Sequence, residues 1–250
     1  MRGKQKLNLT LIRHAQSKFN VAELEHAFDK VKFSTRFIDP EITELGMKQA
    51  QELSNQLKNK PYDIVFVSPL VRALQSATLI FKENPGKPKF IAIPTLSEWF
   101  SCSGELGRDY FKMKRAFKHV DFSTIDKLKR PEFWYLNFVR DEEWINSVLE
   151  EATLKKIIEL ETFAGFALEK LRTAPVFPET LENFSDRVQE AKRMVQQLIA
   201  QEGPEKSYAF VTHAVFLQEF TKHEEHPGIQ FDNCQAEEFN LELKNLSISF

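Results

Sequence analysis

The sequence predicts an α/β fold, a three-layer sandwich in which helices cover both faces of a mostly parallel sheet. Three observations carry this prediction. Short apolar segments with the composition of strands alternate with amphipathic helical segments along the chain. Hydrophobic residues make up 42% and charged residues 28% of the 250 residues, which is ordinary for a protein with a packed core. The length permits either one large α/β domain or two smaller ones.

Five segments have the character of strands. The sequence DIVFVSP is a continuous apolar run, as expected for a strand buried on both faces of a parallel sheet. The segment AEEFNLELKN alternates between polar and apolar residues, which favours an edge strand. The predicted strands are residues 7–12, 63–69, 90–93 and 208–211, and the edge strand 236–245.

The predicted helices follow these strands. Thr43 is a suitable N-cap, because its hydroxyl can accept a hydrogen bond from the first turn of a helix. Gly203 and Pro204 end the helical pattern that precedes them. The predicted helices are residues 17–28, 43–57 and 71–79, a long pattern over 142–171, residues 182–201, and a helix that begins near residue 213.

The strand–helix rhythm stops between Glu98 and Pro178. We interpret residues 99–178 as a helical cap insertion within a single domain of residues 1–250. Loops that follow the strands of an α/β sheet build its ligand crevice, so an insertion at this point is expected to cover the site. The alternative is a helical subdomain unrelated to the site.

Composition and charge exclude several classes of partner. The net charge of −2 and the pI near 6.3 provide no positive field for a nucleic acid or an acidic membrane. Cys102 and Cys234 have no metal-binding spacing and are expected to be reduced thiols. No signal peptide or membrane span is apparent, so a cytoplasmic protein is expected. The histidines of the sequence HEEHPG do not have a metal-binding spacing either, and no metal site is predicted.

Three predicted strand ends carry cations or nitrogen bases: Arg13 and His14, Ser68 with Arg72, and His213. Each residue alone is more often structural than functional. Together they suit phosphoryl transfer, because guanidinium groups bind the non-bridging oxygens of a phosphoryl group in a bidentate manner. A histidine near neutral pH is a nucleophile when one ring nitrogen is held as a donor and the other is free.

Four segments, in order, also resemble the motifs of a known family. RHAQSKFN, DPEITELGMKQA, SPLVRALQSA and VTHAVF are similar to RHGExxxN, DxPLTxxGxxQA, SPxxRAxQTA and THG of the histidine phosphatase (phosphoglycerate-mutase-like) superfamily. The resemblance spans Leu9 to about Phe216, and residues 105–178 match only loosely. Ala15 stands where many members have glycine.

The resemblance implies a role for each matching residue. His14 corresponds to the nucleophile, and Arg13, Arg72 and His213 to the phosphate pocket. Asn20 matches a further phosphate contact, and the neighbouring candidates are Gln16 and Ser17.

Two acidic residues are candidates for the proton donor to the leaving group. Glu98 matches the family's acid, and Glu105 lies close enough in sequence to serve instead. Donation near neutral pH requires a raised carboxyl pKa.

These features predict a metal-independent phosphomonoester hydrolase that needs no cofactor and acts on a small phosphorylated substrate or a phosphoprotein. Two alternatives remain: a phosphoglycerate mutase or bisphosphatase, and a non-catalytic module that binds a phosphorylated ligand. Residues typical of the mutases are missing at Trp99, Phe100 and Val215, which favours the hydrolase. A basic cluster is either a solvated helix face or a second anion contact, and its members are Lys112, Lys114, Arg115 and Lys118.

Overall fold

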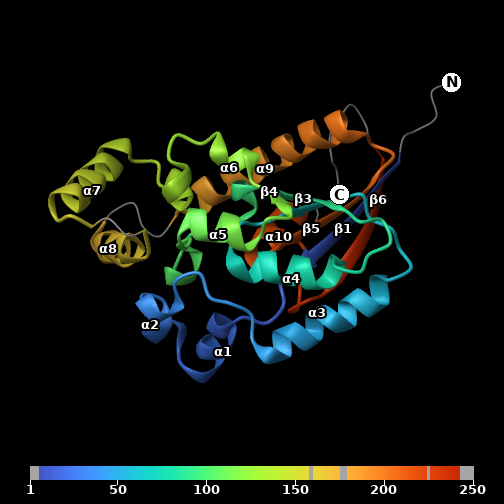
Figure 1. Cartoon of the computed structure of the whole chain (residues 1–250), viewed down its shortest axis with the longest axis horizontal. Helices are drawn as coiled ribbons and strands as arrows, with labels where there is room; N and C mark the ends of the chain where they lie inside the picture. Colours follow the sequence, from blue (N-terminus) through green and yellow to red (C-terminus); the bar gives the residue numbers. More distant parts are fainter. Residues whose placement is uncertain (1–5, 158–159, 175–178, 224–225, 243–250) are drawn as a thin grey trace.

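A six-stranded sheet lies at the centre of the computed structural model (Figure 1), which describes residues 6–157, 160–174, 179–223 and 226–242. The strands lie in the order β4-β3-β2-β5-β1-β6. All neighbours pair in parallel except β6, which runs antiparallel to β1 at the edge of the sheet. The strands are β1 (Lys6–Arg13), β2 (Ile64–Val67), β3 (Lys89–Ala92), β4 (Val120–Asp121), β5 (Ser207–Thr212) and β6 (Ala236–Glu242). The mostly parallel sheet and the edge strand are therefore confirmed, and the antiparallel direction of β6 is an addition from the structure.

Apolar side chains on both faces of the sheet give the molecule three layers. In β2, Val65 and Val67 belong to one core cluster, whereas Ile64 and Phe66 belong to another. Successive side chains of a strand point to opposite faces, so these clusters mark the two sides of the sheet. Helices α3 (Glu44–Leu57) and α4 (Val71–Phe81) cover the first face. Helices α9 (Leu181–Glu202) and α10 (Ala214–Thr221) cover the second (Figure 1). The predicted fold class is confirmed.

The other helices lie outside the two helical layers. Thr43 accepts a hydrogen bond from the Gly46 backbone N–H, which confirms the predicted N-cap of α3. The remaining α-helices are α1 (Lys18–Glu25), α2 (Phe28–Val31), α5 (Tyr110–Ala116), α6 (Ser123–Asp126), α7 (Glu142–Leu154) and α8 (Leu160–Thr173). The 3₁₀ helices are η1 (Thr35–Phe37), η2 (Pro94–Leu96), η3 (Ser103–Glu105) and η4 (Pro131–Phe138).

The long helical pattern over 142–171 is two helices rather than one. Helix α7 ends at Leu154, and Lys156 has a φ of 55°, a left-handed backbone conformation that a right-handed helix cannot contain. Residues 158–159 lie outside the described residues, and α8 begins at Leu160. The α7–α8 pair projects from one end of the molecule (Figure 1).

The start and the end of the segment 99–178 lie side by side. The backbone N–H of Glu179 donates to the carbonyl of Phe100, with an N···O distance of 2.8 Å. Within this segment the two-residue strand β4 extends the sheet beside β3, a pairing that the sequence pattern did not predict. Residues 175–178 lie outside the described residues.

Three parallel strands end at the same edge of the sheet, and this brings the sequence-predicted residues together. Arg13 of β1 pairs with Thr212 of β5, and the next backbone N–H, that of His14, donates to the Thr212 carbonyl. The Ser68 N–H, just after β2, donates to the Val211 carbonyl. Convergence of the three strand ends is thus confirmed. Across the described ranges, no helix combines the length and apolar character that a membrane crossing requires.

Candidate active site

His14 is 3% exposed at the end of β1, and its two ring nitrogens have different partners. Its Nδ1 lies 2.7 Å from the carbonyl oxygen of Ala15, and its Nε2 lies 3.3 Å from the Nε of Arg72. Because a carbonyl only accepts and a guanidinium only donates, Nδ1 carries the hydrogen and Nε2 carries the lone pair. Burial, Arg72 and Arg13 all lower the pKa of His14 well below its usual value. The ring is therefore neutral near pH 7, with Nε2 unprotonated.

The backbone that follows His14 is held by side chains of α3 and α4. The N–H of Ala15 donates to the hydroxyl of Ser76, and the N–H of Gln16 donates to Oε1 of Gln49. Gln16 directs its own side chain away from the pocket lining, because its Oε1 accepts a hydrogen bond from the Thr43 hydroxyl at 2.8 Å. Gln16 thus joins β1 to the start of α3.

Arg13 and Arg72 both reach the pocket beside His14. The guanidinium of Arg72 is 4% exposed and donates to the carbonyl of Gly104 at 2.7 Å. Its other terminal nitrogen lies 3.3 Å from Oε1 of Glu105. Arg13 donates to the carbonyl of Phe231, whereas its buried Nε has no partner among the described residues. The two arginines therefore place two positive charges next to the His14 ring.

His213 is fully buried and lies against His14, with 5.0 Å between the ring centroids. Its Nε2 is 2.8 Å from the hydroxyl of Ser68. Its Nδ1 is buried without a hydrogen-bond partner in the described part of the chain. Burial lowers the pKa of His213 well below its usual value, and Arg72 and His14 lower it further. A bound dianion would offset these charges and favour protonation.

Asn20 and Ser17 form the N-terminal cap of α1. The backbone N–H and the hydroxyl of Ser17 both donate to Oδ1 of Asn20, and Nδ2 of Asn233 donates to the same oxygen. These bonds orient the amide of Asn20 and leave its own Nδ2 available as a donor. Asn20 and Ser17 both line the pocket. Asn233 also donates to the carbonyl of His14, and no sequence motif marked it.

The two candidate acids have different surroundings. Oε1 of Glu98 accepts backbone N–H groups of Trp99 and Phe216, and Oε2 accepts that of Val215, so Glu98 caps the N-terminus of α10. An oxygen with one donor retains a lone pair, so Oε2 can still accept a proton.

Glu105 is 5% exposed and contacts Cys102 and Arg72. Burial raises the pKa of Glu105 to about 7, against the opposing charge of Arg72. This carboxyl group is therefore partly protonated near neutral pH.

Most of the predicted site residues line a cavity of about 370 Å³, whereas Gln16 and His213 lie outside its lining. The lining residues are Arg13, His14, Ser17, Phe19, Asn20, Glu23, Phe28, Arg72, Glu98, Trp99, Ser101, Cys102, Glu105, Ala214 and Val215. Four of them, from Trp99 to Glu105, come from the start of the segment 99–178. The described residues of α7 and α8 contribute none, so the pocket wall opposite the sheet is built by α1, α2 and residues 99–105.

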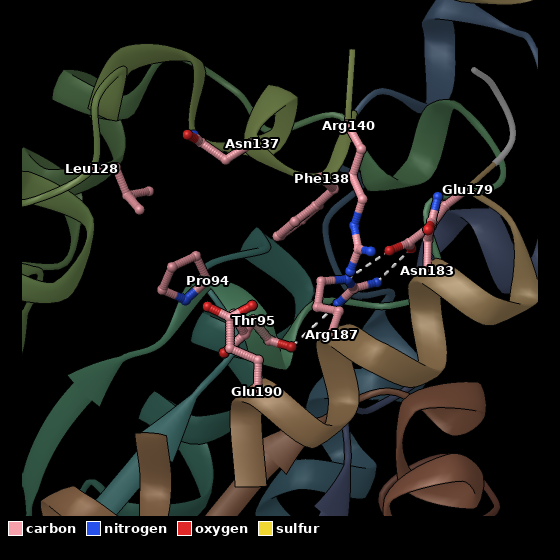
Figure 2. A pocket seen from close by; sticks show the side chains of 10 residues that line it. All are labelled: Pro94, Thr95, Leu128, Asn137, Phe138, Arg140, Glu179, Asn183, Arg187 and Glu190. Atoms are coloured by element: carbon pink, nitrogen blue, oxygen red, sulfur yellow. Dashed lines mark hydrogen bonds and ion pairs between the residues drawn. The ribbon is translucent and has the colours of Figure 1, made fainter. Parts of the chain in front are cut away.

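A second, smaller pocket of about 110 Å³ lies beside the loop that carries Glu98 (Figure 2). At its floor Arg187 of α9 is 4% exposed and pairs with Glu179 through two hydrogen bonds. Arg187 also donates to the carbonyls of Thr95, Ser97 and Glu98. These bonds fix the loop after β3 to α9.

Known proteins resemble this chain in sequence and in fold. Residues 9–121 match the model of the histidine phosphatase superfamily (branch 1). A 2,3-bisphosphoglycerate-dependent phosphoglycerate mutase of Protochlamydia amoebophila is 31% identical over 99 residues, which are 38% of this chain and 40% of that protein. The mutase of the same name from a Methylobacterium species is 36% identical over 92 residues, 36% of this chain and 38% of that protein. The chain thus spans about two fifths of the length of the curated relatives it matches.

Solved structures match over most of the chain. A phosphoglycerate mutase from Bacillus anthracis has a TM-score of 0.54 at 16% identity, covering 96% of this chain and 89% of the other. The ecdysone phosphate phosphatase from Bombix mori, in complex with tungstate, has a TM-score of 0.54 at 14% identity, covering 93% of this chain and 88% of the other. At these identities the likeness shows a shared fold.

Proposed function

We propose that this chain, whose residues 9–121 match the model of the histidine phosphatase superfamily, is a metal-independent phosphomonoester hydrolase that forms a phosphohistidine on His14. The observation that carries the proposal is the tautomer of His14, whose unprotonated Nε2 lies beside two arginines. A neutral imidazole with a fixed N–H on one nitrogen and a lone pair on the other is the nucleophilic form.

In the proposed reaction the substrate dianion binds Arg13 and Arg72, and the amide of Asn20 donates to a non-bridging oxygen. His213 takes up a proton as the dianion arrives. Nε2 of His14 then attacks phosphorus, a P–N bond forms, and the P–O bond to the leaving group breaks. Two guanidinium groups and an imidazolium offset the charge of the transition state, a task that a metal ion performs in other phosphatases.

The leaving alkoxide requires a proton, and we assign its donation to Glu98. Oε2 of Glu98 accepts a single backbone N–H, so a proton on this oxygen leaves the cap of α10 in place. Glu105 is the second candidate, because its carboxyl group is partly protonated near neutral pH. Water then attacks the phosphohistidine, which restores the lone pair on His14 and releases phosphate.

Hydrolysis is favoured over mutase activity by two positions in the pocket wall. Trp99 and Val215 line the pocket where the resemblance leads one to expect the polar residues of a mutase. The curated relatives named above are phosphoglycerate mutases, so phosphoryl transfer between phosphoglycerates is the second candidate function.

The test is phosphate release in EDTA from p-nitrophenyl phosphate, alkyl phosphates, phosphoglycerates and phosphopeptides. We expect wild-type turnover that falls by at least about 10³-fold in His14→Ala. His119→Ala, an exposed histidine outside the pocket, is the matched control and should keep its activity. An alkali-stable, acid-labile phosphoenzyme should be trapped in the wild type. If no ester is hydrolysed while phosphate still binds, the hydrolase proposal is wrong and a binding module remains.

A further inference from the structure

The charges around the pocket are unusual for a protein that handles a doubly anionic substrate. Among the described lining residues the permanent cations are Arg13 and Arg72, and both are needed by one phosphoryl group. The same lining contains three carboxyl groups, those of Glu23, Glu98 and Glu105. A second anionic group on the substrate would therefore meet no further arginine or lysine in this wall.

The three carboxyl groups act on one another and so form one cluster. Burial raises the pKa of Glu23, Arg13 lowers it, and the charge of Glu98 raises it further. The charge of Glu98 also contributes to the raised pKa of Glu105, after burial and against Arg72. Since charges interact appreciably only over a short range, Glu98 lies within electrostatic reach of both others.

Apolar side chains complete the wall beyond the phosphate site. Phe28 and Val215 are each 37% exposed, and Trp99, which lines the same pocket, is half-buried. Phe28 is braced by an edge contact with Phe19, at 6.3 Å between centroids. Such surfaces favour an apolar body in the leaving group.

The basic side chains near this wall do not offset the negative charge of its carboxyl groups. Lys32 lies over the ring of Phe28, but its Nζ is 2.7 Å from the carboxylate of Asp29. The basic cluster that the sequence marked as a second anion contact contributes no residue to the pocket lining; its members are Lys112, Lys114, Arg115 and Lys118.

We propose that this pocket selects phosphomonoesters whose leaving group is apolar and either uncharged or cationic, and that it rejects leaving groups with a second negative charge. The proposal rests on the proposed function, because it concerns the same site. A phosphoglycerate carries a carboxylate as well as a phosphate, and in this pocket that carboxylate would face Glu23 and Glu98. The proposal therefore predicts that phosphoglycerates are poor substrates of this chain. The leaving group would contact the apolar lining formed by Phe28, Trp99 and Val215.

Three esters of nearly equal size test the charge dependence: phenyl phosphate, 4-carboxyphenyl phosphate and 4-(aminomethyl)phenyl phosphate. We expect kcat/KM for the carboxyphenyl ester to be at least about tenfold below that of phenyl phosphate after correction for leaving-group pKa. The aminomethyl ester should equal or exceed phenyl phosphate. Equal or better turnover of the carboxyphenyl ester would overturn the proposal.

Glu23→Lys provides the matching test on the protein. Glu23 lines the pocket from α1, and the new lysine should reduce the discrimination against the carboxyphenyl ester several-fold. Glu25→Lys makes the same charge change on the same helix outside the lining, and its selectivity should equal that of the wild type. The same shift in both variants would indicate bulk charge and would contradict the pocket assignment.

Failure of the proposed function gives a different pattern. If no ester is hydrolysed, the dissociation constants of the three esters for the wild-type protein still decide the inference. Weaker binding of the carboxyphenyl ester alone supports the selectivity while the hydrolase proposal fails. Equal binding of all three overturns the selectivity whatever the catalytic result.

Discussion

Arg72 is shared between the candidate nucleophile and a buried carboxyl group. Its Nε donates to His14, while one terminal nitrogen faces Glu105. A guanidinium has five N–H groups, so Arg72 can contact both and still offer donors to a phosphoryl group. When Glu105 is ionised, however, its charge offsets that of Arg72 and repels the incoming dianion.

Anion affinity should consequently fall as the pH rises through about 7, where Glu105 loses its proton. Tungstate, whose charge is constant over this range, is a suitable probe. We expect its dissociation constant to rise about tenfold between pH 6 and pH 8.5 in the wild type. Glu105→Gln should bind more tightly at pH 8.5 and show a shallower pH dependence. The pH dependence of tungstate binding that remains in Glu105→Gln is assigned to proton uptake by His213.

A comparison of Glu105→Gln with Glu98→Gln distinguishes the two candidate proton donors. If Glu98 is the proton donor, Glu98→Gln should slow alkyl phosphates far more than p-nitrophenyl phosphate, because p-nitrophenolate leaves without help. Glu105→Gln should change the rates of the two esters by the same factor. A selective loss on alkyl phosphates in Glu105→Gln would transfer the role of donor to Glu105.

Single residues also show what sequence reasoning provides and what it leaves out. His14, Arg13, Arg72 and His213 were predicted to converge because each lies at a strand end. Their hydrogen bonds required coordinates, because Ser76, which accepts from the Ala15 N–H, and Asn233, which donates to Asn20, lie far from these residues in sequence. No local pattern marks Asn233.

At the level of secondary structure elements, the first turn of α3 lies against the loop that follows β1 and His14. A Cβ on Gly46 would lie 2.3 Å from the carbonyl oxygen of Gln16, far below van der Waals contact. The helix approaches this closely because only glycine stands there. The same approach allows Thr43 and Gln49 to hold the backbone of Gln16.

Gly46→Ala should therefore destabilise the protein by about 2 kcal/mol or more. It should also reduce turnover, because the loop after His14 must move. Urea denaturation and kcat/KM for p-nitrophenyl phosphate are the measurements. Gly165→Ala, in α8, is the matched control: its Cβ would meet only Thr35 Cγ2, at 3.9 Å. There, better helix propensity should stabilise by about 0.5–1 kcal/mol. Equal effects of the two substitutions would contradict the steric argument.

Element boundaries were predicted where an N-cap or a glycine marked them, as at Thr43 for α3 and Gly203 for α9. The break after α7 was missed because Lys156, rather than a glycine, adopts the left-handed conformation there. The two-residue strand β4 is too short to produce a period of its own. Sequence periodicity finds long elements, and tertiary contacts decide the short ones.

For the whole molecule, the pair of Arg187 and Glu179 joins three parts of the chain. Glu179 lies where the chain returns from α8, Arg187 belongs to α9, and the carbonyls that accept from Arg187 belong to the loop with Glu98. One core cluster also extends from the sheet through α7 and α8, including Val65, Ile145 and Leu168. Both features support the proposal of one domain.

Arg187→Met should cost about 3 kcal/mol or more of folding free energy, because it leaves Glu179 buried without its partner. Arg140, which also lines the pocket in Figure 2, pairs with the exposed Asp186, and Arg140→Met should stay within about 0.5 kcal/mol. Removing both charges, in Arg187→Met with Glu179→Leu, should recover part of the loss. Chemical denaturation measures the free energy of unfolding of the three variants. If Arg140→Met lowers it as much as Arg187→Met does, the stabilising role assigned to the buried pair of Arg187 and Glu179 is wrong.

The position of β1 has a consequence for the biosynthesis of the protein. This strand leaves the ribosome first among the strands, yet its neighbours on both sides begin only at Ser207 and Ala236. At about 5–20 residues per second, its apolar side chains wait roughly 10–40 s for these partners. The nascent chain therefore cannot form the phosphate pocket before β5 has been synthesised. Binding of a chaperone to β1 during this interval would protect the nascent chain from aggregation.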